Sequence, residues 1–171
     1  MLRMAVGHSD DVDLASAMEA VFAECDAGLA GAAPTAGLLM DAWGIDHQVV
    51  IDSVRARYPG IELAGSSSGG EMSSVLGFRE DSVALALFAS DSIDIVVGLG
   101  RDLKADPLAA AYRAVAEATA KTRLPPRLCV VLSTIGGVEP SVMLDALRTA
   151  LGDGVPIVGG GAAPRDPSTE A

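Results

Sequence analysis

The sequence contains one short segment, Gly65 to Glu71 with the letters GSSSGGE, in which serine hydroxyls lie between glycines. Its first five residues match the pattern G-x-S-x-G, in which the central serine, here Ser67, is the nucleophile of α/β hydrolases. That nucleophile sits on a sharp turn leading from a strand directly into a helix, and no helical pattern follows this segment. Both histidines, His8 and His47, also precede the serine, although unrelated folds do permute this order. Hydrolysis or acyl transfer by Ser67 is therefore an alternative interpretation.

The same segment is suited to binding without catalysis. Glycines let the backbone approach a ligand closely, and serine hydroxyls with exposed N–H groups hold a carboxylate or a carbonyl oxygen. A plain tight turn is the remaining possibility. We favour ligand binding, and the predicted ligand-binding residues in this segment are Ser66, Ser67, Ser68, Gly69, Gly70 and Glu71.

Two further candidates follow a short apolar run. Asp41 comes directly after Thr35–Met40, and Trp43, the only tryptophan of the chain, comes two residues later. The indole ring could cover an apolar ligand group or cap the core. Both residues are included in the predicted binding site.

A second glycine-rich segment, with the letters GGGAAPRD, begins at Gly159 and contains Arg165. Gly160, Gly161 and Arg165 are therefore predicted to bind ligand as well. Glu71 and Arg165 give the two glycine-rich segments opposite charges at their ends, which suits a zwitterion such as an amino acid. Solvated loop charges are the alternative interpretation of the same two residues.

Other kinds of site are not supported by the sequence. No G-x-x-x-x-G-K-[ST] phosphate loop occurs, and Gly98-Leu99-Gly100 lacks the third glycine of a dinucleotide-binding motif because position 103 is Leu. Two scattered histidines and two cysteines have no metal-ligand spacing. We expect no metal and no cofactor.

The charge of the chain excludes some partners. Lys and Arg total 12 against 23 Asp and Glu, which gives a formal net charge of −11 with no basic run to offset it. Phosphate backbones and anionic membranes are repelled by such a surface, so neither nucleic acid nor a membrane is an expected partner. We expect no signal peptide and no membrane-spanning stretch, and Cys25 and Cys129 fall at core-like positions. A reducing, cytoplasmic location is predicted.

The candidate residues must be positioned by strands and helices that alternate along the chain. Apolar periodicity, caps and turn residues predict an α/β fold with a mixed, mainly parallel sheet and flanking helices. The strands Ser82–Phe88 and Ile93–Leu99 are predicted to pair as a hairpin across Ala89 to Ser92. The other predicted strands are Leu2–Val6, Thr35–Met40, Ile61–Ala64, Leu128–Leu132 and Val155–Val158, and the predicted helices are Leu14–Leu29, one from Asp46 to Pro59, one from Asp106 to Thr119 and one from Glu139 to Leu151.

The second half of the chain repeats the first. Gly7 matches Gly98, Asp52 matches Asp145 and Gly65 matches Gly159, and the offset changes only slightly between these pairs. Each half is therefore predicted to be a β-α-β-α-β repeat, about residues 1–90 and about 91–166, followed by a tail at 167–171. Chance matches in an alanine-rich chain are the alternative. The strand that follows repeat one has no counterpart after repeat two, so a single domain lacking its C-terminal part is expected.

Three segments, ELAGSSSGGE, GF-x-x-DSVALAL and PIVGGGAA, resemble the N-terminal part of FIST domains. A typical string of that family is G-C-S-T-A-G-E-I, to which Gly65, Ser67, Gly70 and Glu71 conform. Ser66 stands where the family often has Cys, and Ser68 and Gly69 replace Thr and Ala. A role that depends on that Cys would therefore be absent.

The resemblance implies an intracellular sensor of small ligands, proposed to include amino acids, that works beside signalling modules. We therefore expect a non-enzymatic domain that binds a small polar ligand and acts on a signalling partner or a fused output domain outside this chain. A protein-interaction module is a further alternative, since an unpaired strand edge promotes association and a homodimer.

Overall fold

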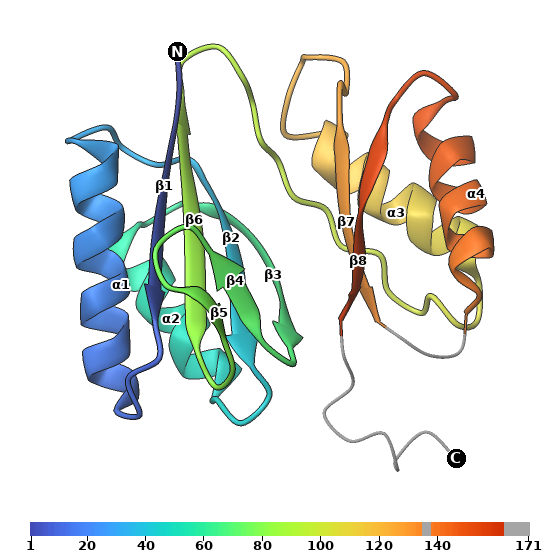
Figure 1. Ribbon diagram of the computed structural model, residues 1–171. Helices are drawn as coiled ribbons and strands as arrows, with labels where there is room; N and C mark the ends of the chain where they lie inside the picture. The colour runs from blue at the N-terminus through green and yellow to red at the C-terminus, as the bar shows by residue number, and fades with distance from the viewer. Residues whose placement is uncertain (135–137, 163–171) are drawn as a thin grey trace. The chain divides into compact units, whose positions relative to one another are not determined.

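The computed structural model describes residues 1–134 and 138–162, which divide into two compact units (Figure 1). Unit 1 is Met1–Ile95 and unit 2 is Val96–Ala171. Unit 1 contains β1 (Leu2–Ser9), α1 (Leu14–Leu29), β2 (Ala36–Ala42), α2 (His47–Arg57), β3 (Glu62–Ser68), β4 (Glu71–Ser73), β5 (Gly77–Arg79) and β6 (Val83–Ser90). Unit 2 contains α3 (Pro107–Thr119), β7 (Cys129–Thr134), α4 (Pro140–Leu151) and β8 (Ile157–Ala162).

The sheet of unit 1 is mixed, in agreement with the predicted α/β fold class. Its strand order is β1-β6-β2-β3, with β2 and β3 parallel and β6 antiparallel to both of its neighbours. β1, β2 and β3 therefore run in one direction and advance one way across the sheet. Right-handed crossovers between them place α1 and α2 on the same face. The two helices of unit 1 therefore pack against one face of its sheet.

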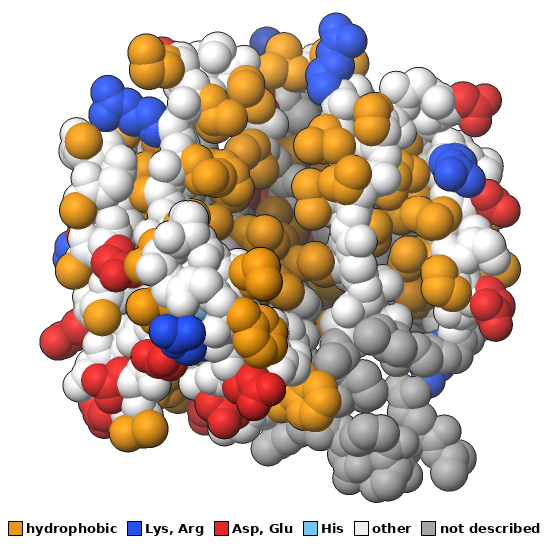
Figure 2. Space-filling model, viewed as in Figure 1, with side chains coloured by type: hydrophobic (Ala, Val, Ile, Leu, Met, Phe, Trp, Pro, Cys, Tyr) orange, Lys and Arg blue, Asp and Glu red, His pale blue; other side chains and the backbone are white. Residues whose placement is uncertain are grey.

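The core of unit 1 lies between this sheet and its two helices. Leu85 and Leu87 of the central strand β6 are fully buried, and they belong to one apolar cluster with Val21 of α1 and Val50 of α2. Cys25 lies in the same cluster, and its thiol donates to the carbonyl oxygen of Leu85 at 3.5 Å. The opposite face carries exposed apolar side chains such as Leu2 and Met4, and hydrophobic side chains are visible over the strands of unit 1 in Figure 2.

The four predicted helices are confirmed, and capping explains where they begin. The side chain of Asp46 accepts from the N–H groups of Gln48 and Val49 at the start of α2. Asp13 and Asp106 cap α1 and α3 in the same way. Aspartate at this position satisfies N–H groups that have no partner within the helix.

The predicted strand Ile93–Leu99 and its hairpin with Ser82–Phe88 are wrong. Residues 93–99 have no strand assignment, and β6 pairs instead with β1 on one side and β2 on the other. Because both edges of β6 are thereby used, no edge remains for a hairpin partner. A small hairpin that the sequence did not predict, β4 with β5, follows β3.

Two strands extend further than their predicted ends. β3 continues to Ser68 and β8 to Ala162, so most of the two glycine-rich segments is strand and not loop. Gly65 permits this pairing because a Cβ there would lie 2.2 Å from the carbonyl oxygen of Leu39 on β2. The backbones of β2 and β3 therefore approach more closely than any side chain at this position would allow.

Unit 2 packs α3 and α4 together beside two parallel strands, β7 and β8. The order of elements in unit 2 is α3-β7-α4-β8. The strand predicted to begin the second repeat, Ile93–Leu99, is missing from it. Two hydrogen bonds nevertheless correspond: the Glu24 carboxylate accepts from the N–H of His8 at 2.9 Å, and the Glu117 carboxylate accepts from the N–H of Leu99 at 3.1 Å. The tandem repeat stays a prediction that these bonds support.

Candidate functional site

The pairing of β2 with β3 aligns the candidate residues of the two strands. Asp41 is the register partner of Ser67, and Leu39 is the partner of Gly65. Because side chains alternate along a strand, Leu39 and Asp41 share one face. The apolar run of β2 therefore ends with a carboxylate on the same face as its buried leucine.

Helix α2 presents a stripe of three side chains toward these strands. His47, Ile51 and Arg55 are spaced four residues apart, which places them on one face of the helix. The Asp46 cap fixes the first turn, and so fixes where His47 begins this stripe.

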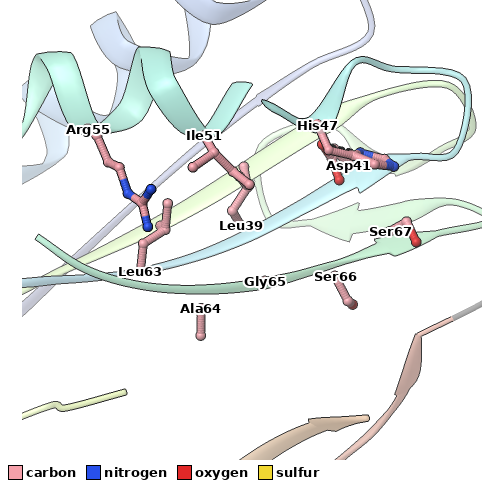
Figure 3. Close-up of a pocket in the computed structure, with 10 residues that line it drawn as sticks. All are labelled: Leu39, Asp41, His47, Ile51, Arg55, Leu63, Ala64, Gly65, Ser66 and Ser67. Carbon is pink, nitrogen blue, oxygen red and sulfur yellow. Dashed lines mark hydrogen bonds and ion pairs between the residues drawn. The ribbon is translucent and has the colours of Figure 1, made fainter. Parts of the chain in front are cut away.

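A groove of about 250 Å³ lies between α2 and β3 (Figure 3). We call it the α2–β3 groove. Three apolar side chains, Leu39, Ile51 and Leu63, form its middle, and Figure 3 shows Arg55 near Leu63 and the His47–Asp41 pair toward Ser67. The complete lining is Leu39, Asp41, His47, Ile51, Arg55, Leu63, Ala64, Gly65, Ser66 and Ser67.

One end of the groove holds a buried carboxylate. The Asp41 side chain is 5% exposed, and its Oδ2 accepts a hydrogen bond from His47 Nδ1 at 2.8 Å. Burial raises the pKa of Asp41, and the hydrogen bond from His47 acts in the opposite direction. Because Nδ1 is engaged with Asp41, the other ring nitrogen of His47 is left to face a ligand or solvent.

The other end of the groove holds a cation. Arg55 is exposed, and its guanidinium forms no ion pair with any residue in the described part of the chain. A guanidinium binds a carboxylate through two parallel hydrogen bonds. The groove therefore offers a positive group and a negative group, separated by apolar side chains.

A second cluster connects the end of β3 with the interior of unit 1. Ser68 Oγ donates to Glu71 Oε1 at 2.6 Å, and Ser82 Oγ donates to Glu71 Oε2. His8 Nε2 lies 2.9 Å from Ser82 Oγ, and His8 Nδ1 lies 2.7 Å from Ser73 Oγ. We call these five residues the His8–Glu71 network.

Only one arrangement of protons satisfies the whole network. Because Ser82 donates to Glu71, it must accept from His8 Nε2–H. Ser73 Oγ already accepts from the N–H groups of Val75 and Leu76, so the Ser73 hydroxyl donates to His8 Nδ1. His8 is thus a neutral imidazole, and burial lowers its pKa from the ordinary value. Glu71 is only 3% exposed and both of its oxygens accept from serines, so it lies inside unit 1.

The predicted segment GSSSGGE is therefore divided between two places. Ser66 and Ser67 line the α2–β3 groove together with Asp41, whereas Ser68 and Glu71 belong to the His8–Glu71 network. Neither the two histidines nor Arg55 were among the predicted binding residues. The spacing of His47, Ile51 and Arg55 after Asp41 was the signal that could have revealed this stripe.

The remaining predicted residues lie elsewhere. Trp43 follows β2, and its Nε1 is buried with no hydrogen-bond partner among the described residues. Gly69 lies beside the Trp43 ring. Gly160 and Gly161 are exposed residues of β8 in unit 2, and Arg165 lies outside the described residues, so its pairing with Glu71 stays a prediction.

The structure changes the case for a catalytic Ser67. Ser67 is a residue of β3, which continues into the β4–β5 hairpin and not into a helix, so the nucleophile elbow is not formed. The Asp41–His47 pair nevertheless resembles an acid that orients a base, and Ser67 lines the same groove. This arrangement keeps the alternative open.

Two kinds of feature are absent from the described residues. None of the helices in residues 1–134 and 138–162 has the length and apolar character needed to span a bilayer. Over those same residues, no three His, Cys, Asp or Glu side chains gather in a way that would hold a metal ion.

Comparison with known protein families gives a match. The family model for the FIST N domain matches residues 36–170, a range that begins at β2 and includes the whole α2–β3 groove. No curated protein matches the chain.

Proposed function

The chain belongs to the FIST N domain family, whose members are sensory domains in signal transduction, and we propose that it senses a small polar ligand, such as an amino acid, in the α2–β3 groove. The family is one of sensory and not catalytic domains, which agrees with a non-enzymatic role. The groove is the part of unit 1 in which the predicted Asp41, Ser66 and Ser67 come together.

One observation carries this proposal: the groove has opposite charges at its two ends. Arg55 supplies a carboxylate-binding group without a competing ion pair, and Asp41 supplies a buried carboxylate that attracts an ammonium group. A charge that is partly removed from water contributes more to binding than a fully solvated one. A ligand carrying both an acid and an amine therefore fits better than a neutral ligand.

The bound ligand is proposed to act on a signalling partner or on a fused output domain in the cytoplasm. The groove includes residues of β3, and β3 continues directly into the turn held by Ser68 and Glu71. A ligand that holds β3 in place would therefore also restrict the position of this turn.

Thermal-shift and calorimetric screening of amino acids tests the proposal. We expect stabilisation that grows with ligand concentration, because a ligand that binds only the folded state raises its apparent stability. Arg55→Gln removes the cation and is expected to abolish this effect. Arg127→Gln, which changes an exposed arginine of unit 2, is the matched control and should leave it intact. A panel without any stabilising member, or an effect that survives Arg55→Gln, contradicts the proposal.

A hydrolase is the second candidate function, and the Asp41–His47 pair beside Ser67 favours it. A fluorophosphonate probe reacts with a serine that a neighbouring base activates. Labelling that is lost in Ser67→Ala would support this candidate. Lack of labelling of the folded wild-type protein would remove it.

A further inference from the structure

We propose that the α2–β3 groove binds an ω-amino acid, a ligand whose acid and amine are at opposite ends of a chain of about six bonds. Its carboxylate would lie at Arg55 and its terminal ammonium at Asp41. An α-amino acid meets this description only when its side chain ends in such an amine, as that of lysine does. This inference rests on the proposed sensory function and names the class of ligand.

The first argument is the separation of the two charges in the groove. His47, which is bonded to Asp41, and Arg55 lie eight residues apart on α2, a rise of about 12 Å. On β3, Leu63 and Ser67 are about 13 Å apart, and Ser67 is the register partner of Asp41. Figure 3 shows Arg55 near Leu63 and Asp41 toward Ser67. The helix and the strand therefore agree on a separation of about 12 Å along the groove.

This separation determines the length of the ligand. A hydrogen bond at each end takes up about 3 Å, which leaves about 6 Å between the acid and the amine of the ligand. An extended chain advances about 3.4 Å for every three bonds, so about six bonds cover this distance. In an α-amino acid the acid and the α-amine are attached to one carbon atom, so these two groups reach only one end of the groove.

The second argument is the surface that β3 presents to α2. Positions 63, 65 and 67 of β3 face α2, on the same side of the sheet as Asp41 of β2. Position 65 is a glycine, so no side chain fills this surface between Leu63 and Ser67 (Figure 3). A narrow chain would therefore lie on the helix-facing surface of β3, beside Asp41, and would need no contact with the outer edge of the strand.

The third argument is the character of the groove between its charged ends. Leu39, Ile51 and Leu63 form the middle of the lining, and a methylene chain buries apolar surface against them. Asp41 is the acidic residue of the described lining, and it lies at the end away from Arg55. An amine beside the acid therefore finds no carboxylate partner in this lining, whereas an amine at the far end of the chain does.

Two isomeric ligands test the inference, because they differ only in the position of the amine. In ε-aminocaproate the amine ends the chain, and in norleucine it is beside the acid. NMR titration of the full chain gives the dissociation constant of each. We expect ε-aminocaproate to bind at least about tenfold more tightly, since only its ammonium reaches Asp41. Lysine is norleucine with an added terminal amine, so it should regain the affinity that norleucine lacks.

The length of the chain has its own test. We compare ε-aminocaproate with γ-aminobutyrate, which is two methylene groups shorter, and with the ω-amino acid that is two methylene groups longer. The shorter ligand reaches one charged group at a time, and the longer one must bend to reach both. We therefore expect ε-aminocaproate to bind most tightly of the three. Equal binding at all three lengths would overturn the spacing on which the inference depends.

Each charged contact is tested with a ligand that lacks the matching group. Pentylamine is ε-aminocaproate without its acid, and hexanoate is ε-aminocaproate without its amine. In Arg55→Gln, ε-aminocaproate and pentylamine are expected to bind equally, whereas in Arg127→Gln the acid should keep its advantage. In Asp41→Asn, ε-aminocaproate and hexanoate are expected to bind equally. A preference that survives the matching substitution overturns the assignment of that contact.

Because Asp41 is buried, circular dichroism and thermal unfolding of Asp41→Asn are needed to show that this variant is folded. If it is not, the comparison of the two isomers on the wild-type protein and on Arg55→Gln, an exposed position, decides by itself.

The outcomes separate this inference from the proposed function. Norleucine that binds as tightly as ε-aminocaproate, and loses this binding in Arg55→Gln, overturns the inference and leaves the sensory proposal in place. Binding of no amino acid of either kind contradicts both. Binding of ε-aminocaproate that is unchanged in Arg55→Gln also contradicts both, because each assigns the ligand's acid to this arginine.

Discussion

At the scale of single residues, His8 is a buried base that unit 1 holds in its neutral form. Burial lowers its pKa from 6.5, while Glu71, Asp10 and Glu24 oppose this shift and Arg79 adds to it. The unfolded chain binds a proton near pH 6.5 and the folded chain binds it only at lower pH. His8 therefore contributes stability at higher pH that is lost as the pH falls through about 6.5 and below.

We predict that His8→Gln weakens this dependence on pH. Denaturant unfolding between about pH 8 and pH 5 should show the wild-type protein losing stability more steeply than the variant. At pH 8 the variant is expected to be less stable by roughly 2 kcal/mol, because Ser73 and Ser82 lose a buried partner. Parallel pH profiles for the two proteins would show that His8 does not titrate in this way.

Gly65 permits the close approach of β2 and β3. We predict that Gly65→Ala destabilises the protein by about 2 kcal/mol, because its Cβ would overlap the carbonyl oxygen of Leu39. Gly44→Ala is the matched control in the same unit, since a Cβ there meets nothing within 4 Å. Urea unfolding measures the free energy of unfolding of both variants. An equal loss of stability in the two would show that β3 can move away from β2 without destabilising the protein.

Residue identity alone predicted part of the candidate site. Asp41 and the serines were recognised because they follow apolar runs, and two of those serines do line the groove with Asp41. His47 and Arg55 were missed because a polar residue on a helix is usually solvated. Glu71 was predicted to bind ligand at the end of a glycine-rich segment, since no local pattern shows that Ser68 and Ser82 donate to it inside unit 1.

At the scale of elements, the helix starts differ in one respect. Asp13, Asp46 and Asp106 cap their helices through the side chain, whereas Glu139, before α4, makes no such bond. We predict that Glu139→Asp stabilises unit 2 by about 0.5 kcal/mol, since the shorter carboxylate reaches the free N–H groups of the first turn. Thermal unfolding is the measurement, and Asp106→Ala, expected to cost about 1 kcal/mol, is the opposite control.

Helices were easier to predict than strands for a physical reason. A cap, a proline at the first position and a periodic apolar face are all local, and they located α2, α3 and α4 closely. Strand pairing depends on partners that are distant in sequence. β6 was found as a strand, but nothing local shows that it enters between β1 and β2, which leaves residues 93–99 outside that sheet.

At the scale of the whole molecule, the two units differ in how much core their described residues form. The buried cluster of unit 1 includes Val21, Leu85 and Leu87, whereas the buried members of the unit 2 cluster are Ala111, Ala146 and Leu147. A unit that buries little apolar surface gains little stability to offset the entropy of folding. The mixed α/β class was predictable from the alternation of elements, but this difference between the two units was not.

We predict that residues 1–95 produced alone fold cooperatively and that residues 96–171 alone do not. Circular dichroism melts and the dispersion of amide signals in NMR spectra test both fragments. A cooperative transition in the isolated second fragment would contradict this prediction. It would mean that α3, α4 and their two strands bury enough apolar surface to fold alone.

Because Cys25 is buried, the reactivity of its thiol reports how often unit 1 opens. Each unit contains one cysteine, and burial raises the pKa of the Cys25 thiol to about 12, while Cys129 is only partly covered. Since the thiolate is the reactive form, alkylation of Cys25 must wait for α1 to separate from the sheet. The alkylation rate at Cys25, followed by mass spectrometry, therefore measures how often unit 1 opens, and a ligand that tightens this unit slows that rate without any label or substitution.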